Sequence, residues 1–522
     1  MFDFIIKNAQ VIDGGGSDAR TADIAIKDGR FAQIGSIDEG APGAQIIDAR
    51  GLYAIPGFVD IHRHGDLAPV LGRETTEELM QGITNYVNGN CGFSAVPSSD
   101  AHFEELRRYA KPIIGNIPPE LACLSGKNFF QRLSEQALSA NTGYLIGAGA
   151  LRICEKGFET GALSRKELDA VCGKLSDLID AGALGLSMGL MYVPENFTPT
   201  EQLAEMCRVP ARKGKLIAVH MRGEGSSLIA SVDEIIDLAR RTGGRFHISH
   251  LKAAGKRTWN DLLPRALDRI HAAQAQGVDI TYDVYPYCAG STALYTLFPP
   301  DTQDGGVAGL VEQMRNAQFR ARMRSELATE HDSWDNIIAS TGWQSVTIVG
   351  ASDSKCIGKN IEEIAAERGV TPVDCAMDLM LENNGDVPMV IHSMSESDME
   401  LALSAPGAIV ISDALYAEGG MPHPRRYGAA ARAVSHYGKR FGLAKMVRAC
   451  TALPAERMGL SGRGRIAEGY YADMLLLDMD RFHDRATYTD PIRLPEGIHC
   501  IFVNGRLAVS DGKLLGKYGK IL

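Results

Sequence analysis

The chain has 522 residues, of which 45% are hydrophobic and 23% are charged, the balance of an ordinary globular protein. Its formal net charge of −10 and its pI of about 5.8 argue against a nucleic acid or an anionic membrane as its partner. The length is too great for one minimal domain and leaves room for a large core.

The first residues, MFDFIIKN, carry Asp3 inside their apolar run and lack the basic segment and long apolar stretch of a signal peptide. No apolar run approaches the roughly 18–20 residues of a membrane span. The 10 cysteines follow no paired spacing, so we expect reduced thiols and a cytoplasmic location.

Both ends of the chain contain short strand-like segments that are separated by turn signals. The pairs Asp28-Gly29 and Asn504-Gly505 are typical of tight β-hairpins. We therefore predict one small β-sandwich domain formed from both termini, residues 1–55 and 470–522, with a larger domain over residues 56–469 inserted between them.

The middle of the chain alternates strand-like with amphipathic helix-like segments. Such alternation predicts a parallel sheet with right-handed crossovers, and its scale predicts an α/β fold, a TIM-like (β/α)8 barrel. We expect residues 294–343, which are charged and helix-like, to leave the barrel as a lid-like insertion. The candidate strands are residues 54–61, 84–88, 183–187, 216–220, 246–250, 280–284, 347–349, 387–391 and 408–412.

Residues 57–64, GFVDIHRH, form an apolar run that ends in two histidines one residue apart. Positions i and i+2 of a strand face the same side, so His62 and His64 can converge on one point. Two imidazoles so placed form half of a transition-metal site. By itself the pair is equally compatible with a strand end that exposes one ring.

Other strands end in residues that can bind a metal. Cys91 follows residues 84–88 in a glycine-rich turn, GNCG, and Asp413 follows the apolar run 409–412. Taken alone, Cys91 would be a buried structural thiol and Asp413 a helix cap. Because the carboxyl ends of barrel strands meet at the catalytic face, we expect these two residues to lie near the histidine pair.

Two further apolar strands end in histidine, at His220 and His250. His247 lies three residues before His250, which places it on the opposite face of its strand, so we do not expect it to be a ligand. One strand-terminal histidine would be unremarkable in a core, but several in separate barrel units predict a metal site.

The sequence resembles the amidohydrolase superfamily and, within it, the N-acyl-D-amino-acid deacylases (D-aminoacylases). The resemblance covers nearly the whole chain. It is carried by GFVDIHRH (57–64), GNCG (89–92), GLSMGLMY (185–192), HMRGE (220–224), ISHLK (248–252), YPYCAGST (285–292), Ser412-Asp413 and HPR (423–425).

The resemblance implies a zinc-dependent hydrolase that cleaves the amide bond of N-acyl-D-amino acids, a small-molecule substrate. It implies one tightly bound Zn²⁺ on Cys91, His220 and His250. A second, weaker metal position would lie beside His62, His64 and Asp413. The cysteine takes the place of the carboxylated lysine of other superfamily members, so no modified lysine is expected.

The resemblance also implies roles in catalysis. Asp413 would be the general base and then the general acid, and Tyr192 would stabilise the oxyanion. Lys252, Tyr285 and Arg425 would bind the substrate carboxylate, with Ser291 nearby. Without the resemblance, Tyr192 is a rim aromatic, and Lys252 and Arg425 are surface charges.

Some positions depart from the family. Arg63 is bulkier than the small residue expected between the histidines, and we expect it to face away from the metal. Residues 414–422 differ from the glycine- and histidine-rich loop of the best-known members. Residues 285–294 add no cation that would select an acidic side chain, so specificity for acyl-D-glutamate or acyl-D-aspartate is not predicted.

Three alternatives stay open from the sequence. They are a cyclic-amide hydrolase of the hydantoinase type, a D-dipeptidase of the same superfamily, and a non-catalytic scaffold relative. The preference for D over L substrates rests on the resemblance alone, and the oligomeric state is open.

Overall fold

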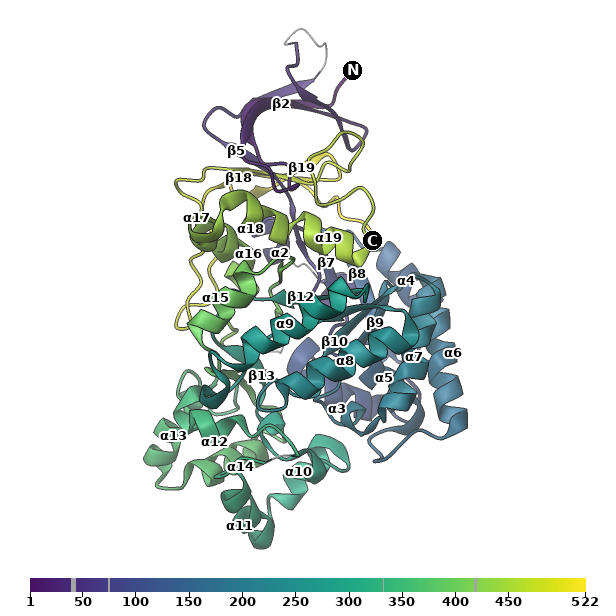
Figure 1. Cartoon of the computed structure of the whole chain (residues 1–522), viewed down its shortest axis with the longest axis vertical. Helices are drawn as coiled ribbons and strands as arrows, with labels where there is room; N and C mark the ends of the chain where they lie inside the picture. Colours follow the sequence, from purple (N-terminus) through teal and green to yellow (C-terminus); the bar gives the residue numbers. More distant parts are fainter. Residues whose placement is uncertain (39–43, 74–75, 332, 417–419) are drawn as a thin grey trace.

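The computed structural model describes residues 1–38, 44–73, 76–331, 333–416 and 420–522. Three parts follow one another along its long axis, with a β-sheet of both termini at one end, a barrel in the middle and a smaller layer at the other end (Figure 1). None of the described helices combines the length and the apolar character needed to cross a bilayer.

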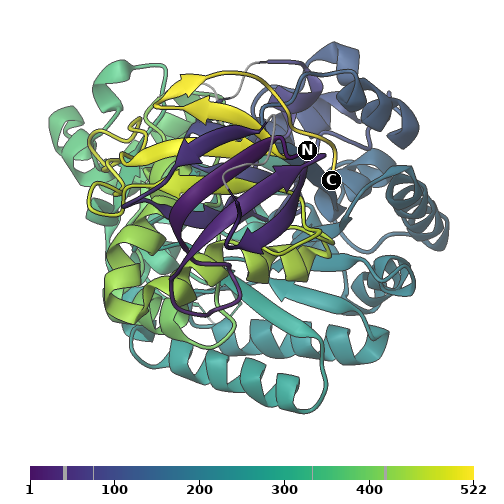
Figure 2. The same ribbon diagram turned by 90° about the horizontal axis from the view of Figure 1, so that it is seen from above.

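The terminal part is a nine-stranded mixed sheet. The two tight turns predicted from the sequence are present, because Lys27 pairs with Arg30 and Val503 pairs with Arg506 across two-residue loops of positive φ. Figure 2 shows the strands of the two ends side by side. The strands are β1 (Phe4–Val11), β2 (Arg20–Lys27), β3 (Arg30–Gly35), β4 (Gln45–Asp48), β5 (Tyr53–Pro56), β17 (Met474–Leu477), β18 (Ile498–Val503), β19 (Arg506–Ser510) and β20 (Lys513–Leu514).

The central part is the predicted (β/α)8 barrel, which is confirmed. Eight strands pair in parallel, with β6 and β16 at the two ends of the sheet. The strands are β6 (Phe58–Asp60), β7 (Ile83–Asn88), β8 (Asn141–Gly147), β9 (Gly185–Gly189), β10 (Leu216–His220), β11 (Arg245–Ile248), β12 (Ile280–Val284) and β16 (Ile409–Val410).

Helices pack around the barrel, and most of them bury one apolar face, as α6 (Arg165–Ala181) does with Leu168, Val171, Leu175 and Leu178. The sequence signals are clear in α6, because Ser164 and Glu167 form a reciprocal capping box at its start and Gly182 ends it. The main barrel helices are α3 (Phe103–Ile114), α5 (Ala148–Lys156), α6 (Arg165–Ala181), α7 (Thr200–Arg212), α8 (Leu228–Thr242), α9 (Leu262–Ala275), α15 (Glu396–Ser404), α16 (Arg425–Arg432), α18 (Leu443–Cys450) and α19 (Ala452–Met458).

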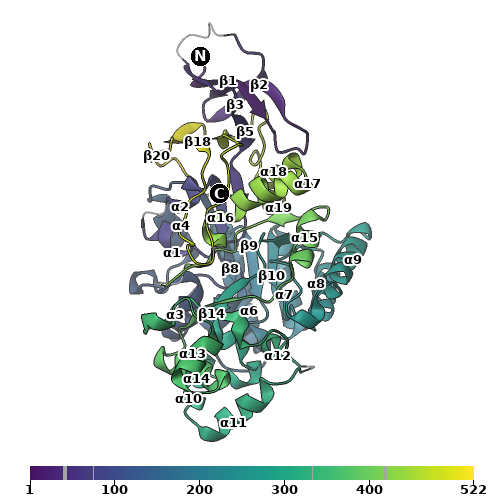
Figure 3. The same cartoon turned by 90° about the vertical axis from the view of Figure 1, so that its left-hand side faces the viewer.

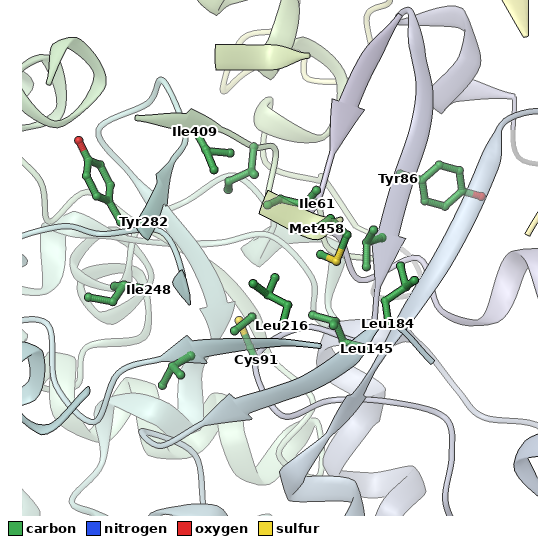
Figure 4. Close-up of a cluster of buried hydrophobic side chains, with 14 of the residues drawn as sticks. Ile61, Tyr86, Cys91, Leu145, Leu184, Leu216, Ile248, Tyr282, Ile409 and Met458 are labelled. Atoms are coloured by element: carbon green, nitrogen blue, oxygen red, sulfur yellow. The ribbon is translucent and has the colours of Figure 1, made fainter. Parts of the chain in front are cut away.

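The barrel strands and the helices around them share one packed apolar core. Figure 4 shows Leu145, Leu216, Ile248 and Ile409, each from a different strand, in one buried cluster that also contains Cys91. Most of the side chains that carry the chemistry lie at or near the strand ends.

The barrel closes between its first and last strands just beyond β6 and β16. The Asp413 amide donates to the His62 carbonyl at 3.0 Å, and the His64 amide donates to the Ala414 carbonyl at 3.0 Å. Two predicted ligand segments are therefore joined directly by backbone hydrogen bonds.

The third part, which we call the cover layer, comprises residues 290–391. Its strands β13 (Gly290–Ala293), β14 (Val346–Ile348) and β15 (Pro388–Ile391) pair antiparallel, and its helices pack on them around a separate apolar core. It lies beyond the barrel from the terminal sheet (Figures 1 and 3). The helices are α10 (Gly306–Gln313), α11 (Ala317–Glu326), α12 (Ile337–Thr341), α13 (Ile361–Arg368) and α14 (Pro372–Glu382).

The cover layer is longer than the expected insertion over residues 294–343. The candidate strands 347–349 and 387–391 belong to it as β14 and β15, so their assignment to the parallel barrel is wrong. Short apolar runs carry no signal for the direction of pairing. The barrel strand β8 takes the remaining place.

Candidate active site

The predicted ligands all lie at the carboxyl ends of barrel strands and all are buried. The arrangement follows from the strand ends, because each apolar run stops where its last side chain reaches the barrel mouth. His62 and His64 follow β6, Cys91 follows β7, His220 ends β10, His250 follows β11 and Asp413 follows β16.

Cys91 lies between imidazoles. Its Sγ is 3.2 Å from His62 Nε2 and 3.5 Å from His250 Nε2. Burial alone would raise the pKa of the Cys91 thiol, but the imidazoles of His62, His220 and His250 outweigh it and hold the pKa well below its ordinary value. The lowered pKa favours the thiolate of Cys91, which is the form that binds metals.

His220 has both ring nitrogens buried without a hydrogen-bond partner among the described residues. Its ring centroid is 4.5 Å from that of His250. Burial lowers the pKa of His220, which favours the neutral imidazole that serves as a metal ligand. Two buried ring nitrogens without a hydrogen-bond partner are rare in proteins. Coordination of a metal ion would give one of these nitrogens a partner.

The second group contains His62, His64 and Asp413, whose ligand atoms lie within 4.8 Å of one another. Asp413 Oδ1 is 3.2 Å from His64 Nε2 and 3.5 Å from His62 Nε2, and its Oδ2 is 2.8 Å from Arg425 Nη2. Burial would raise the pKa of Asp413, but Arg425 and His62 outweigh burial and hold it well below the ordinary value.

These donors fit zinc. One sulfur and several imidazole nitrogens are the ligands that Zn²⁺ prefers, and open positions are typical of catalytic sites. Three overlapping groups among the described residues bring their ligand atoms within 4.8 Å of one another: His62–Cys91–His250, His62–His64–Asp413 and His220–Glu224–His250.

Backbone conformation supports a functional role for this cluster. Cys91, His250 and Asp413 have positive φ angles of 53°, 36° and 49°, which are strained for residues other than glycine. Such strain collects at functional sites, where the surroundings hold the side chain in one direction.

Asp283, near the end of β12, is a site residue that the sequence analysis missed. Its Oδ2 accepts from His247 Nε2 at 2.8 Å and lies 3.4 Å from His62 Nδ1, and its Oδ1 accepts from the His250 amide. It thus orients two predicted ligands. His247 contacts Asp283 and Thr281 and belongs to none of the three candidate metal groups. The strand-end position of Asp283 was the available signal.

Glu224, in the loop after β10, is a second missed residue. Its Oε1 lies 2.5 Å from Lys252 Nζ and 3.0 Å from His250 Nδ1. Lys252 Nζ is also 2.7 Å from His250 Nδ1. The predicted carboxylate-binding lysine is therefore paired with an acid of its own, beside a predicted ligand.

Arg425 begins α16 and is 1% exposed. Its guanidinium lies over the Tyr285 ring, 4.6 Å from the centroid, and its Nη2 donates to the Ser291 carbonyl at 3.2 Å. Its Nε and Nη1 have no hydrogen-bond partner among the described residues. The Ser291 hydroxyl donates to the Met389 carbonyl at 3.0 Å.

Tyr192 follows β9 and lies beside the metal cluster. Its ring centroid is 4.9 Å from that of His220, and its hydroxyl is 3.4 Å from Thr292 Oγ1 of the cover layer. Burial and the nearby Cys91 raise the pKa of Tyr192 well above its ordinary value. The phenol therefore stays protonated and can donate a hydrogen bond.

A cavity of about 870 Å³ joins these side chains to the cover layer. The barrel supplies its polar floor, which includes Cys91, His220 and Asp413. The cover layer supplies an apolar wall that includes Leu297, Phe298 and Trp334. A volume of this size and an apolar wall with a few convergent polar groups are typical of small-molecule sites.

A parallel barrel with cysteine, histidine and aspartate donors converging at its mouth defines a metal-dependent (β/α)8-barrel hydrolase. The chain belongs to the amidohydrolase family, whose profile matches residues 45–509.

Characterised relatives match over nearly the whole length. N-acyl-D-aspartate deacylase of Alcaligenes xylosoxydans xylosoxydans is 31% identical over 98% of this chain and 93% of that protein. N-acyl-D-glutamate deacylase of the same organism is 31% identical over 100% and 96%. The structure is similar to N-acyl-D-glutamate deacylase from Bordetella bronchiseptica complexed with zinc and a phosphonate inhibitor, with a TM-score of 0.82, 29% identity and coverage of 100% and 99%.

Proposed function

We propose that the protein is a zinc-dependent deacylase of N-acyl-D-amino acids, with a preference for neutral, apolar side chains. One observation carries the proposal. Cys91 and the histidines converge on the floor of a cavity in whose wall the Arg425 guanidinium keeps two nitrogens free. The names of the full-length relatives favour this function over cyclic-amide hydrolysis and over a non-catalytic scaffold.

Cys91, His220 and His250 would hold one tightly bound Zn²⁺, and His62, His64 and Asp413 would form a weaker second position. Bound zinc supplies Lewis acidity, which polarises a carbonyl group and lowers the pKa of water to about 7. Asp283 and Glu224 would keep the imidazoles in the orientation that the ligands require.

Asp413 would transfer a proton from the attacking water to the leaving amine. Its carboxylate is ionised, because Arg425 and His62 lower its pKa, and it lies beside the histidine pair where water would attack. It would accept the proton of that water and then deliver it to the departing amine, as general base and general acid. The Tyr192 hydroxyl would donate a hydrogen bond to the oxyanion of the tetrahedral intermediate.

Arg425 and Lys252 would bind the carboxylate of the substrate. The Nε and Nη1 of Arg425 have no partner among the described residues, so the guanidinium can donate a charge-assisted hydrogen bond to a carboxylate oxygen. Lys252 would add a point charge from beside Glu224. Tyr285 keeps the guanidinium in place through its ring face.

The remaining cation of the cavity is already neutralised. Arg222 forms paired 3.1 Å hydrogen bonds with the Glu234 carboxylate and donates to the Asn196 carbonyl at 2.8 Å. Arg222, Lys252 and Arg425 are the Lys and Arg residues among the described residues of the cavity lining. The positions outside the described ranges contain no Lys or Arg in the sequence.

The cavity also carries a carboxylate that would repel a second one. Asp335, from the cover layer, accepts hydrogen bonds from Gly225, Ser226 and Ser227 of the loop after β10. None of these donors carries a charge. A substrate with an acidic side chain would therefore find no free cation and would face Asp335, whereas an apolar side chain can pack on Leu297 and Phe298.

A substrate panel tests the proposal. The zinc-loaded protein is assayed for kcat/KM with N-acetyl-D-leucine, N-acetyl-D-methionine, N-acetyl-D-glutamate and N-acetyl-D-aspartate, with N-acetyl-L-leucine, a D-dipeptide and a hydantoin as controls. We expect the two apolar D substrates to exceed the two acidic ones by at least about a hundredfold, since an unpaired buried carboxylate costs several kcal/mol. Faster turnover of the acidic substrates would refute the side-chain preference, and turnover of the hydantoin alone would refute the deacylase function.

A further inference from the structure

Arg63, which lies between His62 and His64 in the chain, is a fully buried cation with 0% exposure. Its side chain points away from the metal cluster, as expected from the sequence, and the hydrogen-bond partners of its guanidinium among the described residues belong to none of the candidate metal groups. The guanidinium instead lies where the first and last barrel strands meet. It contacts Asp60 of β6 and Ser412, which follows β16.

One end of the guanidinium binds the residue next to Asp413. Nη1 donates to Asp60 Oδ2 at 3.0 Å and to Ser412 Oγ at 3.1 Å. The Ser412 hydroxyl donates to the same Asp60 oxygen at 2.5 Å, and its backbone amide donates to Asp60 Oδ1 at 3.2 Å. Ser412 is thus fixed by both its side chain and its backbone.

The other end binds the segment just after Asp413. Nη2 donates to the Tyr416 hydroxyl at 2.5 Å and to Glu78 Oε1 at 3.3 Å. The Tyr416 hydroxyl also donates to Glu78. The Arg426 guanidinium covers the Tyr416 ring at 4.1 Å from its centroid.

Asp413 lies between these two attachments, in a positive-φ conformation. The strand before it, β16, has two residues, and two backbone hydrogen bonds join its segment to the histidine pair. The backbone alone therefore supplies little to hold a strained carboxylate in one direction.

We propose that Arg63 is a positioning residue, which holds Asp413 in its working direction by binding Ser412 on one side and Tyr416 on the other. The proposal rests on the role proposed for Asp413. A planar fork can bind both sides at once, whereas a lysine presents a single point charge. Arg63 acts through Asp413 and touches neither substrate nor metal.

A double-mutant cycle tests the proposal. In zinc-loaded protein, Arg63→Met is expected to lower kcat by about 10- to 100-fold, the usual cost of losing such a supporting contact, while KM changes by less than about threefold and the zinc content is unchanged. In an Asp413→Asn background, the same substitution should change kcat by less than about threefold, because the residue that Arg63 positions is already lost. Arg63→Lys should recover part of the loss.

Arg457→Met is the matched control. Arg457 is also a buried arginine, and it pairs with Asp279 and the Phe246 carbonyl near the start of β11, away from the site. We expect Arg457→Met to lower the unfolding temperature. In each background, it should change kcat by less than about threefold relative to the same protein without this substitution.

Two outcomes would overturn the proposal. One is an equal kcat loss from Arg63→Met with and without Asp413. The other is a loss of activity in folded protein that follows loss of zinc. If Arg63→Met does not fold, Tyr416→Phe removes one attachment without leaving a buried charge unpaired, and wild-type kcat in that variant would also overturn it. Near-normal turnover of Asp413→Asn would instead refute the proposed function of Asp413.

Discussion

Asp413 is surrounded by groups that favour its ionised form. Arg425 binds one carboxylate oxygen, and the two histidines after β6 lie beside the other. These contacts bind the carboxylate oxygens themselves, whereas the role proposed for Arg63 is to hold the chain on either side of Asp413. A residue in this position can exchange a proton without a change in the backbone.

Replacing Asp413 by Asn should lower kcat by about 10²- to 10⁴-fold, because the amide has similar shape but cannot accept the proton. Zinc at Cys91 should remain, since the sulfur and the histidines on β10 and β11 are untouched. Steady-state kinetics with N-acetyl-D-leucine and metal analysis of the purified variant check both parts. Asp378→Asn, in the cover layer, is the control, and a variant at position 413 with wild-type kcat would contradict the role.

Replacing Asp283 by Asn should weaken metal binding by about 10- to 100-fold. The carboxylate accepts from His247 and lies beside His62 Nδ1, and a neutral amide would hold these rings less firmly. Competition with a chelator of known affinity measures the change. An unchanged zinc affinity would show that the ligands do not depend on Asp283.

The sequence predicted the ligand candidates because each lies at or just beyond the end of an apolar run, which is a local signal. It missed Asp283 and Glu224 because no local signal marks their role. Their importance lies in contacts with His62 and His250, which come from other strands. The pairing of Lys252 with Glu224 was hidden in the same way, since no spacing relates the two residues.

The secondary-structure elements were likewise predicted only in part. Strands that end in histidine or cysteine were recognised, and so were the two hairpins of the terminal sheet. The barrel strand β8 was missed because it begins with Asn141 and contains Gly143 and Gly147, residue types that are depleted in strands. Two apolar runs of the cover layer were taken for barrel strands because periodicity does not reveal the direction of pairing.

Within the cover layer, Asp374 joins α14 to α11. Its Oδ1 lies 3.0 Å from Arg320 Nη2 and 2.8 Å from Arg324 Nη2. Burial would raise the pKa of Asp374, but hydrogen bonds from Arg324, Thr371 and Arg320 outweigh burial and lower the pKa to about 2. The carboxylate therefore stabilises the cover layer only while it is ionised.

The pH dependence of stability follows from that shift. The pKa is lower in the folded than in the unfolded chain, where it is about 3.9, so the contribution is fully present above about pH 4 and is lost as the pH falls towards 2. Asp374→Asn should lower the unfolding temperature at pH 7, by an amount equivalent to about 1–2 kcal/mol. The difference from wild type should shrink below pH 4, and a difference that stays constant down to pH 2 would contradict the ion pair.

At the scale of the whole molecule, the three parts of the structure have different roles. The terminal sheet lies at the end of the barrel away from the cover layer (Figure 3), the barrel supplies the donors, and the cover layer supplies the apolar wall of the cavity. All ten cysteines lie within the described residues and are free, so a thiol is available for the metal. The cytoplasmic location stays a prediction.

The central claim is that a sulfur and several imidazoles from distant parts of the chain bind one metal ion. It is tested most directly by replacing the metal with Co²⁺ and recording the absorption spectrum of the protein and of its Cys91→Ser variant. We predict a sulfur-to-cobalt charge-transfer band in the wild type that is absent from the variant, with Cys207→Ser, a buried cysteine elsewhere in the barrel, behaving like the wild type. A wild-type protein that binds cobalt without this band would contradict the account.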